Sequence, residues 1–213
     1  MTTIVCAIKP EVKPFMDALQ HKEKVAHKSL VVYKGILCGE EVMVARCGVG
    51  LIKSAAAVQA LITDLGASKI IMSGTAGGIY NRLKIGDTVI SDEIIYHEFG
   101  IDFIDSKADA SLLEKADHVV YTTQFTQTVV IGRISSGSKF VTGKDRGLIS
   151  SKYGPLCSDM ETAAVSQVAI ENNVPFIAVR SISDTKDKSG LINFFKYVSL
   201  ASYNSFVVAQ LLI

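Results

Sequence analysis

Short runs of β-branched and other apolar residues alternate along this chain with stretches whose apolar residues recur at helical spacing. Such alternation is typical of an α/β fold, in which helices cover both faces of a central sheet. The segments 29–37 and 41–46 flank a three-residue turn and predict a β-hairpin, so the sheet should be mixed. Strands are expected at 3–7, 29–37, 41–46, 69–73, 87–95, 128–134, near Cys157, and at 176–180.

The helical patterns are unequal in strength. The clearest covers 51–65, where apolar residues share one face and Gly66 provides a stop. Periodicity is weak from 99 to 127, which indicates mobile or peripheral structure. No repeat or linker divides the chain, so we expect one domain spanning 1–213. Further helices are expected at 11–20, 160–172 and over much of 194–212.

Composition excludes several classes of protein. The chain has 213 residues, 48% of them hydrophobic, with 22 Lys and Arg against 21 Asp and Glu. This charge balance does not predict a basic surface for binding nucleic acid, and no apolar run is long enough to cross a membrane. The N-terminal segment is interpreted as a buried strand, not a signal peptide. Four separated cysteines without a CxxC pair favour free, mostly buried thiols and therefore the cytoplasm.

Two glycine-rich turns are predicted at 47–50 and 73–78. Glycines there permit either tight strand-to-helix packing or close approach of the backbone to a ligand, and the pattern alone leaves both open. Neither turn has the complete GxGxxG pattern of dinucleotide-binding proteins. The segment 132–139 resembles a phosphate-binding P-loop but has Ser138 where lysine is needed, so ATP or GTP binding is disfavoured.

Charged residues gather near predicted strand ends. Asp184 and Arg180 follow a buried strand, where α/β sheets place ligand sites, although Asp184 could equally cap a turn. Glu11 could complement a helix N-terminus. Ser158 and Glu161 fit a capping box, or Glu161 could face sugar hydroxyls or water. No cluster has metal-ligand spacing, so we expect no metal.

Several of these segments occur together in the order of a known family. They are 7–11, 47–50, 73–78, 86–93, 159–161 and 179–184. The chain resembles the nucleoside phosphorylase/nucleosidase family over nearly its whole length, and within it the nucleosidases that act on 5′-methylthioadenosine and S-adenosylhomocysteine. The resemblance implies a phosphorylase/hydrolase-like α/β domain with a twisted mixed sheet, no cofactor, a nucleoside substrate, a role in methionine salvage, and a homodimer.

The resemblance also assigns catalytic roles. Asp184 matches the general acid that protonates N7 of an adenine-like base, and Ser183 orients it. Glu11 matches the base that activates a water placed with Arg180. Glu161 matches the carboxylate that binds the ribose hydroxyls. For its role Asp184 must hold a proton at neutral pH, which requires partial burial.

A second set of residues matches substrate-binding positions. Phe140 would stack on the base with the Val141 backbone at its edge, while Met160 would pack beneath the sugar. Thr75 stands where the family usually has serine, near the water or anion position. The whole set consists of Ile8, Val49, Thr75, Gly77, Phe140, Val141, Met160 and Phe194.

Alternatives remain within and outside hydrolysis. Phosphorylase relatives carry a phosphate-binding arginine where this chain has Met72, and Lys9-Pro-Glu11 replaces their phosphate loop, so water is favoured as nucleophile. A purine nucleoside phosphorylase, a futalosine hydrolase and a non-catalytic nucleoside-binding or storage protein are the other interpretations. Ser138 and Lys139 depart from the nucleosidase pattern, and a shortened segment after Phe99 leaves the 5′-substituent open.

Overall fold

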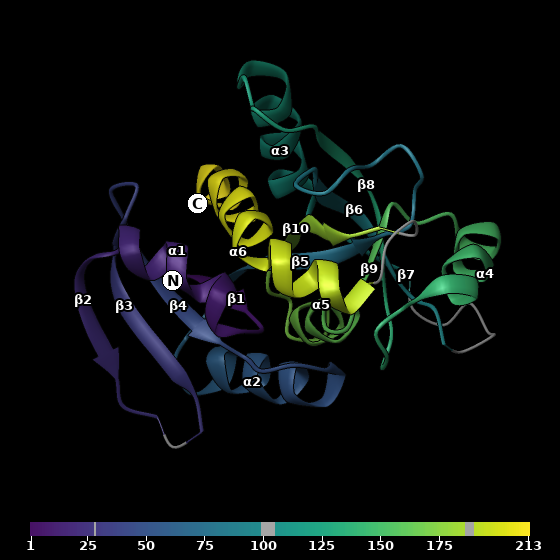
Figure 1. Cartoon of the computed structure of the whole chain (residues 1–213). Coiled ribbons are helices and arrows are strands. Elements are labelled where there is room, and N and C mark those ends of the chain that lie inside the picture. Colours follow the sequence, from purple (N-terminus) through teal and green to yellow (C-terminus); the bar gives the residue numbers. More distant parts are fainter. Residues whose placement is uncertain (28, 99–104, 186–189) are drawn as a thin grey trace.

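The computed structural model describes residues 1–27, 29–98, 105–185 and 190–213 (Figure 1). Strands and helices alternate through most of the chain, as the sequence predicts. In chain order the elements are β1 Thr2–Cys6, α1 Lys9–Ala18, β2 Gln20–Val25, β3 Val31–Leu37, β4 Glu40–Arg46, α2 Leu51–Thr63, β5 Lys69–Gly78, β6 Thr88–Tyr96, β7 Asp105–Lys107, α3 Ala110–Thr122, β8 Val129–Ser136, α4 Gly143–Tyr153, β9 Cys157–Asp159, α5 Thr162–Glu171, β10 Phe176–Asp184, α6 Gly190–Ala209 and a 3₁₀ turn at Gln210–Leu212.

The strands form one 10-stranded mixed sheet, in the order β10-β6-β8-β9-β5-β1-β4-β3-β2 with β7 beside β6. Because β10 also pairs with β5, the first five of these strands close on themselves, and the remaining strands extend from β5. The expected hairpin is present as antiparallel β3 and β4, while β1 runs parallel to both β4 and β5. The predicted α/β class with a mixed sheet is confirmed.

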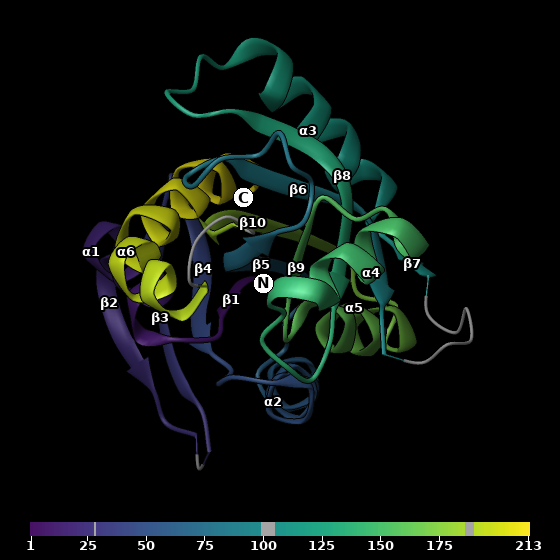
Figure 2. The same cartoon turned by 45° about the vertical axis from the view of Figure 1, so that its right-hand side comes forward.

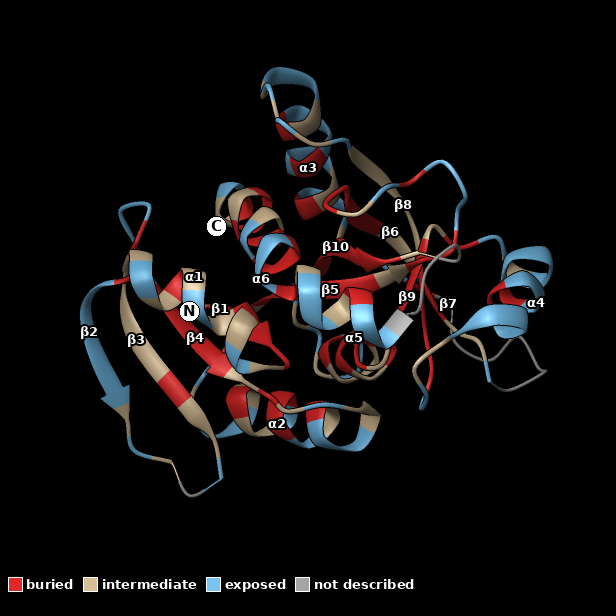
Figure 3. Ribbon diagram, in the orientation of Figure 1, coloured by how far each residue is buried: buried red, intermediate tan, exposed pale blue. Residues whose placement is uncertain are grey.

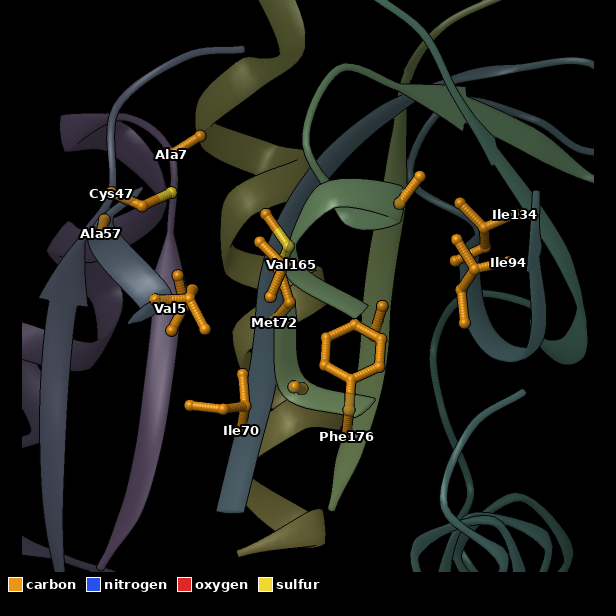
Figure 4. Packing of buried hydrophobic residues seen from close by; sticks show 14 of the residues in the cluster. Val5, Ala7, Cys47, Ala57, Ile70, Met72, Ile94, Ile134, Val165 and Phe176 are labelled. Atoms are coloured by element: carbon orange, nitrogen blue, oxygen red, sulfur yellow. The ribbon is translucent and has the colours of Figure 1, made fainter. Parts of the chain in front are cut away.

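Helices cover both faces of this sheet. One face packs against α2 and α5, which also contact each other, and the other against α1, α3 and α6 (Figures 1 and 2). Figure 4 shows the first of these two cores, to which the sheet contributes Val5, Met72 and Phe176 and helix α5 contributes Val165. The helices turn exposed residues outward, while β10 is buried along its whole length and β5 along most of its length (Figure 3).

Several sequence expectations differ from the structure. The stretch 73–78 was expected to be a turn but continues β5, and β10 likewise runs beyond 180 to Asp184. Within this extension of β5, Gly74 lies against the side chains of Arg180 and Glu11, and Gly77 lies against those of Arg146 and Asp184. The helix expected from 160 begins at Thr162 instead.

The segment 99–127 contains more order than its weak periodicity predicts, although 99–104 lies outside the described residues. Asp109 caps α3 by accepting the backbone N–H groups of Ser111 and Leu112. Leu112, Ala116 and Val119 then bury one narrow stripe of that helix. Strands β2 and β7 and helix α4 were also not predicted. A polar helix with a short apolar stripe gives little periodic signal, which explains the omission of α3.

Two expectations from composition concern the state of the cysteines and the presence of membrane-spanning helices. All four cysteines are free, and only Cys38 among them is exposed, which confirms the expectation of mostly buried thiols. Within the described ranges of the chain, no helix combines the length and apolarity that a membrane span requires.

Candidate active site

A cavity of about 420 Å³ opens where the carboxyl ends of β1, β5 and β10 meet the beginning of α1 and α6. The volume suits a small organic ligand. Every residue that the sequence assigns to catalysis or substrate binding lines it, with the exception of Arg180. These lining residues are Ile8, Glu11, Val49, Thr75, Gly77, Phe140, Val141, Met160, Glu161, Ser183, Asp184 and Phe194.

Glu11 is held by both of its carboxylate oxygens. It is the third residue of α1, and its Oε2 accepts the backbone N–H groups of Ala7 (2.9 Å) and Ile8 (3.2 Å). Its Oε1 accepts the N–H of Thr75 (2.8 Å) and the hydroxyl of the same residue (2.9 Å). Glu11 therefore both complements the start of α1 and presents a fixed carboxylate to the cavity.

Arg180 lies fully buried behind the cavity wall on β10. Its Nε is 2.7 Å from Oδ2 of Asp159, and its Nη2 is 3.6 Å from Oε2 of Glu161. Nη2 also donates to Oγ1 of Thr162 at 2.9 Å. Burial acts to lower the pKa of Arg180, but the adjoining carboxylates raise it above its usual value, so the guanidinium stays charged. Its Nη1 has no hydrogen-bond partner among the described residues.

Asp159 takes the capping role that the sequence gave to Ser158. Its Oδ1 accepts the backbone N–H groups of Glu161 (3.1 Å) and Thr162 (3.0 Å) at the start of α5. The other oxygen of Asp159, Oδ2, pairs with Arg180, whereas the hydroxyl of Ser158 has no hydrogen-bond partner among the described residues. Of the two interpretations of Glu161 that the sequence left open, the capping box is not formed.

Glu161 instead faces the cavity. Its Oε1 accepts the N–H of Gly50 at 2.9 Å, so the first glycine-rich turn directs a backbone donor at this carboxylate. Burial, together with the nearby carboxylate of Asp159, raises the pKa of Glu161 to about 7, while Arg180 opposes the shift. Glu161 is thus a carboxylate that changes charge close to neutral pH.

Asp184 ends β10 with its side chain buried. Burial raises the pKa of its carboxyl, an effect opposed by the guanidinium of Arg146 and by the Ser183 hydroxyl. That hydroxyl donates to Oδ1 at 2.9 Å, and Arg146 forms an ion pair with Oδ2. A buried carboxyl with these partners can both hold and release a proton.

Apolar side chains form another part of the cavity wall. The rings of Phe140 and Phe194 meet edge to face with centroids 6.2 Å apart, and Phe194 meets Phe195 in the same manner at 5.4 Å. Phe195 and Val49 are 75% and 48% exposed at the mouth. The cavity therefore joins a polar region with an apolar region that reaches solvent.

Sequence reasoning missed some lining residues. Arg146 had no motif, because α4 was not predicted; Asp145 in its first turn and Gly154 as its left-handed C-cap were the available signals. Pro10, Leu191, Phe195 and Val198 extend the apolar wall. Of the two departures from the family pattern, Lys139 lines the cavity, while Ser138 donates its N–H and hydroxyl to Glu98, both at 2.8 Å.

The electrostatics of the cavity favour a ligand that becomes positively charged. Four carboxylates line it, from Glu11, Asp159, Glu161 and Asp184, whereas its lining cations are Lys139 and the paired Arg146. Such an arrangement can stabilise a developing cation and deliver a proton to a departing group. Among the residues that the structure describes, no group of three or more His, Cys, Asp or Glu could hold a metal ion.

Known proteins resemble this chain over nearly its full length. A family model described as the phosphorylase superfamily matches residues 2–201. A 5′-methylthioadenosine/S-adenosylhomocysteine nucleosidase of Bacillus cereus (strain G9842) is 30% identical over 95% of this chain and 93% of its own length.

Solved structures agree with these sequence relatives. A Borrelia burgdorferi B31 protein bound to adenine, provisionally named as the same kind of nucleosidase, superposes with a TM-score of 0.93 at 30% identity, covering 100% of this chain and 98% of that chain. The corresponding nucleosidase of Colwellia psychrerythraea 34H in complex with adenine gives 0.92 at 25% identity, with 99% and 93% covered. A futalosine hydrolase of Helicobacter pylori shares the fold at 0.91 and 24% identity, with 99% and 96% covered.

Proposed function

Because this chain belongs to the phosphorylase superfamily and is an N-glycosidic hydrolase of the nucleosidase type, we propose that it hydrolyses 5′-methylthioadenosine/S-adenosylhomocysteine-type nucleosides and releases adenine. The observation that carries the proposal is the gathering of Glu11, Glu161 and Asp184 around one cavity. These carboxylates come from α1, the α5 entrance and β10, so the fold itself assembles them. Two carboxylates beside the sugar and a proton donor at the base are what glycosidic cleavage needs.

Asp184 acts on the base. Cleavage leaves negative charge on the purine unless N7 receives a proton, and the raised pKa of Asp184 favours the protonated form that donates it. Ser183 holds one carboxyl oxygen through its 2.9 Å hydrogen bond. Phe140 stacks on the base and the Val141 backbone contacts its edge, supported by their place in the cavity wall. An aspartate that donates at N7 can accept from the 6-amino group, which favours adenine over a 6-oxo base.

Glu161 binds the 2′- and 3′-hydroxyls of the ribose, with Met160 beneath the sugar. The Gly50 N–H occupies Oε1 from one side, and a carboxylate retains acceptor capacity for hydroxyl donors. As the glycosidic bond stretches, the ribose gains oxocarbenium character, and the negative charges of Glu161 and Glu11 stabilise it.

Glu11 is the base that takes a proton from the attacking water, with Thr75 beside it. Four hydrogen bonds from neutral N–H and O–H groups hold the Glu11 carboxylate in one orientation. Arg180 acts from behind the wall through its unpaired Nη1, which lies beside Glu11 across Gly74. Because water must be oriented as well as deprotonated, a fixed carboxylate and a nearby donor suit this step.

Water is the nucleophile in preference to phosphate. A phosphate dianion would enter a cavity lined by the acidic side chains of Glu11, Asp159 and Glu161 as well as by Asp184. At the position where phosphorylases carry an arginine, Met72 is buried, and its sulfur accepts from Nη2 of Arg180 at 3.3 Å. Nε of Arg180 is already paired with Asp159. These contacts disfavour the phosphorylase alternative.

The chain forms a homodimer in the cytoplasm, where the reaction serves methionine salvage. The free thiols support a reducing compartment. Ile52 at the start of α2 is 86% exposed and Val49, three residues earlier, is 48% exposed, and a second copy would cover these apolar side chains. Sedimentation should show a dimer for the parent chain and a monomer for Ile52→Glu, and a monomeric parent would contradict this part of the proposal.

The central test is product analysis with 5′-methylthioadenosine in buffers with and without phosphate. We expect adenine and free methylthioribose at a rate independent of phosphate. A sugar 1-phosphate would establish a phosphorylase, and inosine or futalosine cleavage without adenine release would overturn the assigned base. Asp184→Asn should lower kcat by about 100-fold or more while retaining affinity for adenine. The exposed Asp17→Asn on α1 is the matched control.

A binding or storage protein makes the opposite prediction. It would hold adenosine derivatives without turnover, and Asp184→Asn would have no turnover to remove. The retention of Glu11, Glu161 and Asp184 around the cavity supports the enzyme.

A further inference from the structure

Arg146 of α4 is a buried cation whose guanidinium joins three parts of the cavity wall. Its Nε donates to the carbonyl of Val141 at 3.1 Å, and its Nη1 donates to the carbonyl of Gly78 at 3.1 Å. Its Nη2 forms the ion pair with Oδ2 of Asp184. Only 3% of the residue is exposed. Burial of an unpaired arginine would be costly, so these contacts specify where it lies.

The backbone of β5 is shaped to admit this pair. A Cβ atom on Gly77 would lie 2.9 Å from Nη2 of Arg146 and 3.2 Å from Oδ2 of Asp184. Any side chain at 77 would therefore press on both members. The absence of one allows the pair to form against the cavity wall, where all three residues lie.

The surroundings of Asp184 contain few other groups that could control it. From β10 comes the Ser183 hydroxyl, and from α4 the charge of Arg146. From β5 come Gly77 and Gly78, which carry no side-chain charge. Within the described ranges, Arg146 is thus the charged residue acting on this carboxyl.

We propose that Arg146 is a positioning residue that directs the Asp184 carboxyl toward the base and limits the pH range over which this carboxyl carries its proton. The inference rests on the proposed function, because it assumes that Asp184 is the acid. The same guanidinium anchors Val141, next to the stacking Phe140, so one side chain couples the base-binding segment to the proton donor.

The sign of the effect follows from electrostatics. A nearby cation favours the ionised carboxylate, so Arg146 lowers the pKa of Asp184 against the effect of burial. Removal of that charge raises the pKa, and the protonated acid then persists to higher pH. The alkaline limb of kcat/KM, where activity falls as the acid loses its proton, should move upward.

The experiment measures kcat/KM for 5′-methylthioadenosine across pH in Arg146→Gln and Arg146→Met. We expect the alkaline limb to rise by about one to three pH units, the usual effect of losing an adjacent opposite charge. Arg146→Lys keeps a charge and should leave the limb near its parent position. Lys144→Met removes an exposed charge from the same helix and should shift nothing.

Glutamine retains N–H donors for the carbonyl groups of Val141 and Gly78, so Arg146→Gln tests the inference even if the methionine variant fails to fold. Adenine affinity and the melting temperature show whether each variant is folded. An unchanged limb with a uniform fall in kcat at every pH would overturn the inference, as would a downward shift. Asp184→Asn, assayed in parallel, distinguishes the role of Asp184 as the acid from the positioning role of Arg146. Full turnover in that variant overturns the assignment of Asp184 as the acid, whereas its inactivity with unshifted Arg146 variants overturns only the positioning role. A parent chain that releases no adenine from 5′-methylthioadenosine overturns the proposed function itself.

Discussion

Arg180 and Glu11 both lie against the bare backbone of Gly74. A Cβ atom added there would lie 2.4 Å from Nη1 of Arg180 and 2.6 Å from Oε1 of Glu11. A cation on β10 and a carboxylate on α1 thus approach each other only because β5 has no side chain between them. The glycine serves close approach of side chains in this protein, not a turn.

Gly74→Ala should therefore disable the enzyme with little change in secondary structure. The new methyl group displaces the two side chains that we assign to the water, and misplacement of reacting groups by about 1 Å costs on the order of 100-fold in rate. The measurement is kcat for 5′-methylthioadenosine, accompanied by circular dichroism.

Gly147→Ala is the control for that substitution. Gly147 is an exposed residue of α4, and a Cβ atom there would meet nothing within 4 Å. We expect unchanged kcat and a gain in stability of up to about 1 kcal/mol, because alanine is the better helix former. Near-parent activity in Gly74→Ala would contradict the water-binding assignment.

Glu161 makes substrate affinity depend on pH. Its pKa is raised to about 7, so the carboxylate that should accept the ribose hydroxyls becomes protonated as the pH falls below this value. We expect KM to rise by roughly tenfold for each pH unit below that point, as for any single ionisation required for binding.

Glu161→Gln should bind substrate more weakly above about pH 7, where the parent carboxylate is charged, and lose the pH dependence on the acid side. The exposed Glu171→Gln at the far end of α5 should retain it. A KM independent of pH between about 5.5 and 8 in the parent enzyme would be incompatible with the role given to Glu161.

The central strands of the sheet could be predicted from sequence, but the residues at which they end could not. Apolar runs located the central strands, but the glycines of 73–78 predicted a turn where β5 continues. Local propensity misled here because Gly74 and Gly77 are adjacent to long side chains of other elements, a tertiary effect that no sequence window contains. Helix α4 lacked an apolar stripe, since its buried residues are Arg146 and Ile149.

Residues of the cavity could be named from sequence where they lie next to a predicted helix or strand and also match a motif of the family. Glu11, Glu161 and Asp184 each follow or precede a recognisable element, and all three line the cavity. Arg146 lies 38 residues from Asp184 in sequence, and an arginine on a polar helix normally faces solvent. Only the folded chain shows that it is buried.

The apolar wall should favour an alkylthio group over a 5′-hydroxyl. Phe194 stands between Phe140 and Phe195 in a row of edge-to-face contacts. Phe194→Ala should lower kcat/KM for 5′-methylthioadenosine by about 10–100-fold, the usual value of a lost apolar contact of this size, and affect adenosine less. Tyr121→Ala, 92% exposed on α3, is the control. Equal losses for both substrates would place Phe194 away from the 5′-group.

The stability of the site depends on the anchoring of α1. Phe15 lies one turn after Glu11, is fully buried, and meets Phe206 of α6 edge to face with ring centroids 5.0 Å apart. Phe15→Ala removes this contact and leaves a cavity, so we expect the free energy of unfolding to fall by about 3–5 kcal/mol. Phe195→Ala removes a ring that is 75% exposed and should cost less than about 1 kcal/mol. Urea denaturation of both variants measures the difference, and equal losses would show that α1 is not anchored through Phe15.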